Sequence, residues 1–591
     1  MCDGCEPLPW FRADRFTRRD ALRFAGALTA TAGLTAALRP ATAAAEPRAL
    51  DPAPASVRAV INGTIVTMDP AQPDTTAMLL EGDRIALLGT DSEVQDALRQ
   101  RGGTEVTDLG GQVATPGFID PHGHFLGIGV GTLTANLAAP PLGSVDSIAE
   151  VLDRLRTQAA THPGIGDLVW VLGQQFDDTG IRERRFPTLA ELDATVPDRP
   201  LLVVHDSGHL AMVNSRGLAK LGITAATPDP AGGKYGRNPD GTPNGILYET
   251  AASATLNSAL PTLDPTALLG VLDAATSAAL SVGVTTALDA AATPALVTAY
   301  NALAQVRYLQ VRVGLWVNGD TLQALRTAAD KAPNRAPWVQ TLGVKGFADG
   351  SIQGWTAALT EPYHTFPEGG PPQGPAGRLR SSVAELTDLI VEAFGRNLPA
   401  AIHANGDAAA DAVIAATRAA REKTGSTVPV LMQHCQVLRD DQIAALAPLG
   451  IAASVFARHI YVWGDRHVEL FLGPERAARM DPARSLIDHG VSVTLHNDAP
   501  VTPLHPLLTM RDAVERRTAS GRVLGADERI TPTEALAAYT SEAARQHGLA
   551  DRGRLAPGLL ADFTVLDADP RSADLGAIQV QQTWVGGVRR K

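Results

Sequence analysis

The sequence predicts an α/β fold built on a TIM (β/α)8 barrel. Short apolar runs alternate with Ala-rich helical stretches along the middle of the chain, which is the rhythm of a parallel sheet. A closed barrel of this kind needs eight parallel strands. The eight candidates are residues 113–119, 282–288, 311–317, 342–347, 400–403, 430–434, 451–455 and 491–495.

Strand-like runs also occur at both ends of the chain. Those near the start are residues 57–61, 64–68, 77–80 and 84–88, and those near the end are 561–566 and 579–585. The pair Asn62-Gly63 is a hairpin signal between the first two runs. Neither set can bury a core alone. We therefore expect one small β-sandwich built from both chain ends, with residues 57–112 and 553–591 contributing.

The gap between the first and second barrel strands is too long for one helix. It contains strand candidates of its own at residues 168–172 and 201–205. The sequence therefore predicts an insertion at about 138–258, inside a barrel that spans 113–552.

The first residues resemble a twin-arginine signal peptide. Arg18 and Arg19 precede an apolar run at 24–38, and small residues suited to cleavage follow at 41–46. At about 15 residues the run is short for a membrane span, which needs about 20. We expect a signal peptide at 1–45, a linker at 46–56, export through the twin-arginine machinery and no stable membrane insertion; the alternative is an amphipathic first helix.

Composition limits the partners. The net charge is −12, with 63 acidic and 51 basic residues. Nucleic-acid-binding surfaces usually show a basic patch or stripe, so we expect no nucleic-acid partner. If the signal peptide is removed, Cys435 is the only cysteine left and no internal disulfide can form.

Polar residues with metal-binding side chains follow several of the predicted barrel strands. Catalytic groups in TIM barrels occupy the carboxyl ends of the strands. His122 and His124 are two residues apart, so they point to the same side of an extended segment. The others are Lys345, His403, His434 and Asp498. Imidazole and carboxylate ligands suit zinc and neighbouring divalent metals, so the pattern predicts a metal site.

The arrangement resembles the amidohydrolase superfamily, and within it amidohydrolase family 3, the YtcJ-like group that includes N-substituted formamide deformylases. The motifs that carry the resemblance are the His122 segment, Asp349-Gly350-Ser351, His403-Ala404-Asn405-Gly406-Asp407-Ala408, Asp498-Ala499-Pro500-Val501 and the closing run at 553–563. Together they cover nearly the whole chain after the linker.

The resemblance implies a ligand set. His122, His124 and Asp498 would hold the more buried metal, and His403 and His434 would hold the second. Lys345, once carboxylated to N6-carboxylysine, would bridge the two ions, which are expected to be zinc. The alternative for Lys345 is an unmodified ammonium paired with a carboxylate.

The predicted function is a metal-dependent hydrolase that cleaves a C–N bond of a small amide-like or N-substituted formamide-like molecule by metal-activated hydroxide. Lys345 and Asp498 would be the catalytic residues, with Asp498 carrying the proton between water and the leaving nitrogen. Two alternatives remain open. One is ester or lactone hydrolysis, or isomerisation, at the same site; the other is an exported, non-enzymatic metal- or ligand-binding protein.

Other candidates concern substrate binding. Trp355, His209, Arg458 and His459 are possible contacts, although each residue type is more often structural. The family often has Gly-Ser before the last aspartate, where this chain has His496-Asn497. His496 could pack, support a ligand or contact substrate. The sequence leaves the oligomeric state open, with a homodimer among the possibilities.

Overall fold

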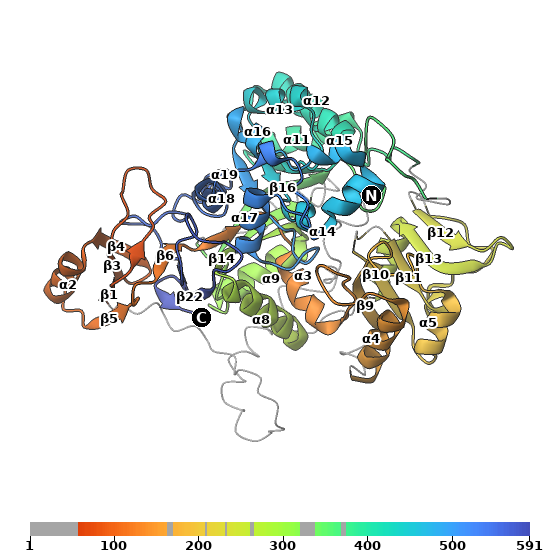
Figure 1. The fold of residues 1–591 in the computed structure, drawn as a ribbon, viewed down its shortest axis with the longest axis horizontal. Helices are drawn as coiled ribbons and strands as arrows, with labels where there is room; N and C mark the ends of the chain where they lie inside the picture. The colour runs from red at the N-terminus through yellow and green to blue at the C-terminus, as the bar shows by residue number, and fades with distance from the viewer. Residues whose placement is uncertain are drawn as a thin grey trace.

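The computed structural model describes residues 57–161, 170–206, 208, 210–230, 233–259, 265–318, 337–367 and 374–591. The predicted signal peptide and linker, together with His209, lie outside these ranges. Three bodies are visible in Figure 1: a central barrel, with the terminal β-sandwich and the insertion on opposite sides of it. Within the described residues, no helix combines the length and apolar character needed to cross a membrane.

The central sheet has eight parallel strands in the order β20-β19-β18-β17-β16-β15-β14-β7. Their bounds are β7 (Phe118–Asp120), β14 (Val284–Ala292), β15 (Arg312–Asn318), β16 (Val339–Phe347), β17 (Ala400–Ala404), β18 (Val430–His434), β19 (Ile451–Val455) and β20 (Val493–Leu495). The two ends of this curled sheet approach each other where the His124 N–H donates to the Ala499 carbonyl at 2.7 Å. The predicted TIM-barrel class is confirmed.

Helices follow the strands and cover the outside of the barrel. They are α8 (Pro265–Ser281), α9 (Pro294–Gln305), α11 (Val383–Gly395), α12 (Asp407–Thr424), α13 (Asp440–Leu446), α14 (Arg458–Arg466), α15 (Gly473–Ala478), α16 (Ala483–Asp488), α17 (Pro506–Glu515), α18 (Pro532–Ala538) and α19 (Ser541–Gln546). Between them lie the short 3-10 helices η3 (Ala447–Leu449) and η5 (Ala526–Glu528) and the π-helix η4 (His467–Phe471).

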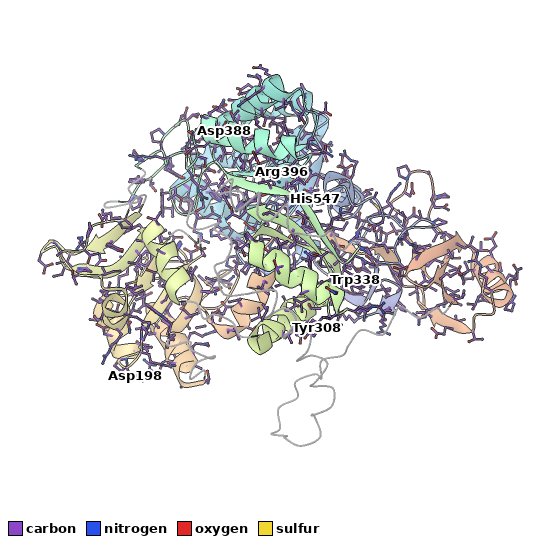
Figure 2. All side chains as sticks on the ribbon, turned by 180° about the vertical axis from the view of Figure 1, so that it is seen from behind. Asp198, Tyr308, Trp338, Asp388, Arg396 and His547 are labelled. Carbon is purple, nitrogen blue, oxygen red and sulfur yellow. The ribbon has the colours of Figure 1, made fainter. Side chains whose placement is uncertain are left out.

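Helix α11 shows why these segments are helical. Ser382 and Glu385 form a capping box that satisfies free N–H groups of the first turn. The buried side chains are Leu386, Leu389, Ile390, Ala393 and Phe394, a spacing that places them on one face. Polar contacts also join neighbouring elements: the Tyr308 hydroxyl after α9 donates to Asp273 of α8 at 2.7 Å. Tyr308 is labelled in Figure 2.

Both chain ends build the β-sandwich. One sheet has the order β4 (Arg84–Gly89), β3 (Ala77–Glu81), β1 (Val57–Ile61) and β5 (Glu105–Asp108), with α2 (Asp91–Gln100) packed on it. The other has the order β2 (Thr64–Ile65), β6 (Val113–Pro116), β21 (Phe563–Leu566), β22 (Val580–Val585) and β23 (Val588–Arg589). The antiparallel pairing of β6 with β21 joins residues from opposite ends of the sequence.

The hairpin predicted at Asn62-Gly63 is wrong. Strand β1 lies between β3 and β5, so both of its edges are already paired. The chain instead turns at Asn62, whose φ is +57°, and β2 joins the other sheet beside β6. The predicted strand at 113–119 is likewise divided between the two bodies, because β6 belongs to the sandwich and only β7 belongs to the barrel.

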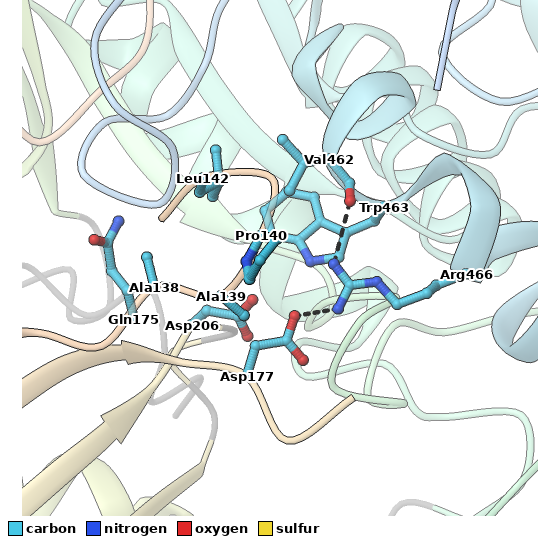
Figure 3. Close-up of a pocket in the computed structure, with 10 residues that line it drawn as sticks. All are labelled: Ala138, Ala139, Pro140, Leu142, Gln175, Asp177, Asp206, Val462, Trp463 and Arg466. Atoms are coloured by element: carbon cyan, nitrogen blue, oxygen red, sulfur yellow. Dashed lines mark hydrogen bonds and ion pairs between the residues drawn. The ribbon is translucent and has the colours of Figure 1, made fainter. Parts of the chain in front are cut away.

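The insertion has a six-stranded sheet in the order β12 (Gly233–Arg237), β13 (Pro243–Glu249), β11 (Leu210–Val213), β10 (Leu201–His205), β9 (Val171–Phe176) and β8 (Ala135–Asn136). Its helices are α4 (Ile148–Thr161), α5 (Leu189–Thr195), α6 (Ser215–Leu221) and α7 (Thr250–Ala259), and α3 (Phe125–Val130) with η2 (Gly131–Leu133) leads into it. Asp177, after β9, forms an ion pair with Arg466 of α14, so the insertion is anchored on the barrel (Figure 3).

Candidate metal centre

The first group of candidate ligands meets at the carboxyl end of the barrel. His122 and His124 lie after β7, and Asp498 lies after β20. The Asp498 Oδ1 atom is 3.3 Å from His122 Nε2 and 3.5 Å from His124 Nε2. All three side chains are buried. The closure of the barrel therefore brings together residues that are more than 370 positions apart in the sequence.

His403, His434 and Lys345 lie on three other strands of the same barrel, β17, β18 and β16. The rings of His403 and His434 are 4.4 Å apart between centroids, and His434 Nδ1 is 4.0 Å from Asp498 Oδ2. The Lys345 ammonium, only 1% exposed, donates a hydrogen bond to the Gln433 side-chain carbonyl. The two halves of the predicted ligand set thus share one buried site.

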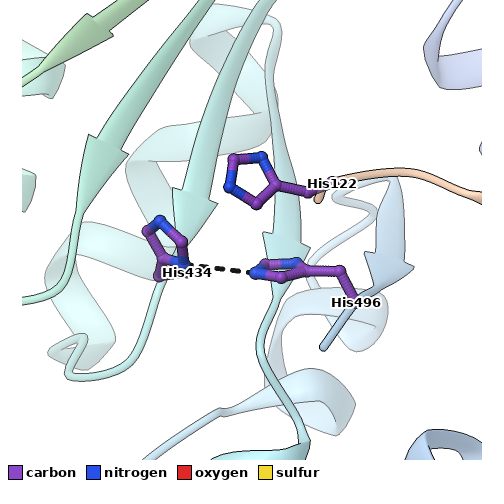
Figure 4. Close-up of side chains that lie close together, drawn as sticks. All are labelled: His122, His434 and His496. Atoms are coloured by element: carbon purple, nitrogen blue, oxygen red, sulfur yellow. Dashed lines mark hydrogen bonds between the residues drawn. The ribbon is translucent and has the colours of Figure 1, made fainter. Parts of the chain in front are cut away.

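His496 is a member of this site whose role the sequence left open. Its Nε2 atom is 3.1 Å from His434 Nδ1, and its Nδ1 atom is 2.9 Å from the Ser454 hydroxyl (Figure 4). Its ring centroid lies 4.8 Å from that of His122. The signal was available in the sequence, because His496 is two residues before Asp498 at the end of the same barrel strand.

The donor set fits a divalent metal. His122 Nδ1, His434 Nε2 and Asp498 Oδ1 are buried and have no hydrogen-bond partner among the described residues. Buried polar atoms are seldom left unpaired in native proteins. In each of two groups, His122-His124-Asp498 and His122-His434-His496, one potential ligand atom per residue lies within 4.8 Å of the others. Imidazole nitrogens with a carboxylate oxygen are the ligands that zinc-like ions prefer.

The electrostatics keep His122, His434 and His496 neutral. Burial lowers the pKa of His122 well below its usual value, and the positive charge of Lys345 lowers it further. Burial also lowers the pKa values of His434 and His496. The second largest cause is the charge interaction with a neighbouring histidine, which also lowers the pKa: His403 for His434 and His122 for His496. A neutral imidazole has the free lone pair that a metal requires. The site is therefore ready to bind a cation.

Asp349, which the sequence marked only as part of a motif, organises the loop after β17. Its carboxylate accepts hydrogen bonds from the backbone N–H groups of Asn405, Gly406 and Ala358, at 2.8 to 3.0 Å. His403 Nε2 lies 3.0 Å from the Gly350 carbonyl. These contacts fix the backbone and the ring of His403, as outer contacts do for metal ligands.

The proposed substrate contacts differ in their surroundings. Arg458 is held in a buried ion pair with Asp512 at 2.6 Å, and His459 is buried 3.5 Å from Asp481. The Trp355 indole donates to the Thr365 carbonyl at 3.0 Å. Arg458 and His459 each already have an aspartate partner, and the roles of all three residues stay predictions.

Comparisons with known proteins identify the family to which the chain is similar. The amidohydrolase family model matches residues 105–590. The chain is 30% identical to the N-substituted formamide deformylase of Arthrobacter pascens, covering 90% of this chain and 97% of that one. It is 29% identical to the putative amidohydrolase YtcJ of Bacillus subtilis, covering 86% and 96%. The solved structure of an uncharacterized metal-dependent hydrolase from Pyrococcus horikoshii aligns with a TM-score of 0.71 at 25% identity, covering 88% and 99%.

Fold and site together define a metal-dependent hydrolase built on a TIM barrel. The chain belongs to the amidohydrolase family, because the family model covers most of its length. It is an enzyme, a metal-dependent amidohydrolase, and its strand-end histidines and Asp498 are candidate ligands for a divalent metal.

Proposed function

We propose that the enzyme cleaves a C–N bond in a small molecule of the amide or N-substituted formamide type. The observation that carries the proposal is the Asp498 carboxylate, buried within 3.3 and 3.5 Å of two imidazole nitrogens at the carboxyl end of the barrel. The similarity to a protein named N-substituted formamide deformylase supports this substrate class.

The residues of the site have separable tasks in this reaction. When bound, a divalent metal lowers the pKa of a water from near 16 to about 7 and polarises a carbonyl. Asp498 accepts the proton of the attacking water on a carboxylate oxygen and delivers it to the leaving nitrogen. His122 and His124 lie beside the Asp498 carboxylate and would bind a metal together with it. His496 supports the ring of His434.

We further propose that the site would hold two zinc ions and that carboxylated Lys345 would be one of their ligands. Gln433 carries the supporting observation: its Oε1 accepts from Lys345, while its buried Nε2 has no hydrogen-bond partner among the described residues. An anionic carbamate on Lys345 needs a donor, and rotation of this amide supplies one. An unmodified ammonium, in contrast, repels a metal ion.

The substrate proposal is tested by metal analysis and a screen of the purified enzyme. We expect about two equivalents of zinc, and release of formate from N-substituted formamides that chelator treatment abolishes and zinc restores. Formate esters with the same substituents are the matched alternative substrates. Turnover of esters alone, or activity that survives complete metal removal, would contradict the proposal.

We also propose that the protein is exported by the twin-arginine machinery. The support is Arg18-Arg19 followed by an apolar run and small residues. Replacing Arg18 and Arg19 by lysine should leave the protein in the cytoplasm, because the machinery reads the arginine pair and not its charge. Fractionation with an antibody measures this, and lysine in place of Arg12 and Arg15 is the control. Undiminished export of the Arg18/Arg19 variant would exclude this route.

A further inference from the structure

We propose that Gln175, in the insertion, is a positioning residue that holds the turn carrying Asp498. The side-chain amide of Gln175 donates a hydrogen bond to the Pro500 carbonyl at 2.9 Å, across 325 positions of sequence. The inferred effect on catalysis rests on the proposed function, whereas the effect on the turn does not.

The turn after β20 is held at successive carbonyls, each by a different partner. The Asp498 carbonyl accepts from the Val501 N–H at 2.8 Å, the Ala499 carbonyl from the His124 N–H at 2.7 Å, and the Pro500 carbonyl from Gln175. Of these partners, Gln175 alone comes from outside the barrel. Asp498 itself has a φ of +48°, a conformation that costs free energy for a residue other than glycine. The surrounding contacts must therefore maintain it.

The backbone conformation of the insertion places the Gln175 side chain next to this turn. Strand β9 pairs with β10 through the registers Gly173 to Val203 and Phe176 to His205. Two residues of β9 therefore oppose one of β10, which defines a β-bulge at positions 174 and 175. Gln175 also has a φ of +64°. Bulges near active sites redirect side chains, and backbone strain tends to occur where function requires it.

The strand end that carries Gln175 is firmly attached to the barrel. Arg466 of α14 pairs with Asp177 and also donates to the Thr179 hydroxyl at 2.8 Å. The cavity between Gln175, Trp463 and Arg466 offers about 10 Å³ to the centre of a water molecule, which is room for about one water (Figure 3). Because the insertion is packed closely on the barrel here, Gln175 can hold the Pro500 carbonyl in one position.

The test compares Gln175→Glu with Gln174→Glu. The first change keeps the shape of the side chain but removes the donor and places a carboxylate against a carbonyl. The second makes the same change at the neighbouring residue of the bulge, whose side chain does not bond the turn. In Gln175→Glu we expect kcat on N-substituted formamides to fall by roughly 10- to 100-fold, because small misplacements of catalytic groups have effects of this size. KM and zinc content should stay near those of the parent.

Hydrogen exchange supplies a readout that does not depend on catalysis. Peptides covering residues 497–504 should exchange faster in Gln175→Glu than in Gln174→Glu or the parent. Parental kcat and exchange in Gln175→Glu, or equal losses in both variants, would overturn the proposal. Faster exchange at the turn in an enzyme whose parent form cleaves no formamide would support the positioning role and overturn the proposed function.

Discussion

Asp498→Asn should lower kcat by roughly 10²- to 10⁴-fold, the usual contribution of a general acid–base group. Asparagine keeps the shape of the side chain and can still offer an oxygen to a metal, but it cannot accept the proton. KM should change much less, because the lost interaction belongs to the transition state. Steady-state kinetics on a formamide substrate, with zinc content measured on the same preparation, checks this result.

One outcome would contradict this role of Asp498. If Asp498→Asn retains its metal and turns over at the parent rate, another group carries the proton. His496 is the first candidate, because its Nε2 already faces His434 in the same site. If metal is lost together with activity, the pH dependence of kcat/KM in the parent enzyme becomes the deciding measurement.

Asp562→Ala should destabilise the protein by about 3–5 kcal/mol, the range for removing one partner of a buried ion pair. Asp562, before β21 of the sandwich, pairs with Arg312 of barrel strand β15 at 2.6 Å and 2.9 Å, and both side chains are buried. The substitution leaves the Arg312 guanidinium without its partner between sandwich and barrel. Urea denaturation followed by circular dichroism measures the change.

The matched control is Asp153→Ala, which removes the exposed pair with Arg156 on α4. Exposed pairs contribute about 0–1 kcal/mol, so this variant should resemble the parent. A similar loss of stability in both variants would show that the buried Arg312–Asp562 pair contributes no more to stability than the exposed pair.

The same pair predicts a pH dependence. Burial alone would raise the pKa of Asp562, but the charge and hydrogen bonds of Arg312 hold it below its usual value. Because the folded-state pKa is below the unfolded one, the contribution of Asp562 is present at neutral pH. It is lost as the pH falls through the folded value. The stability gap between parent and Asp562→Ala should therefore narrow in acid.

The strand pattern and the candidate ligands could be predicted because both depend on local sequence. Apolar runs with polar residues directly after them mark buried parallel strands and their carboxyl ends. In a TIM barrel these ends meet by construction. The sequence therefore predicts that His122, His124 and Asp498 lie together at this end of the barrel. The same argument predicts that His403 and His434 lie at this end of the barrel.

Local patterns failed where pairing depends on which edges are free. Asn62-Gly63 is a strong hairpin signal, yet β1 is already paired on both sides, so β2 crosses to the other sheet. The run at 113–119 likewise predicts one strand, although its first part belongs to the sandwich and its second part to the barrel. The strand propensity of a segment does not show which other strand will pair with each of its edges.

The sequence by itself determined the barrel, the return of both chain ends to one sandwich and the identity of the strand-end residues, because periodicity and motif spacing are local properties. Only the tertiary structure decided that His496 faces His434, that Gln433 bonds Lys345, and that Gln175 reaches the turn of Asp498. These contacts join residues 62, 88 and 325 positions apart. Such contacts follow from how strands close and how an insertion packs, which no short segment of the chain encodes.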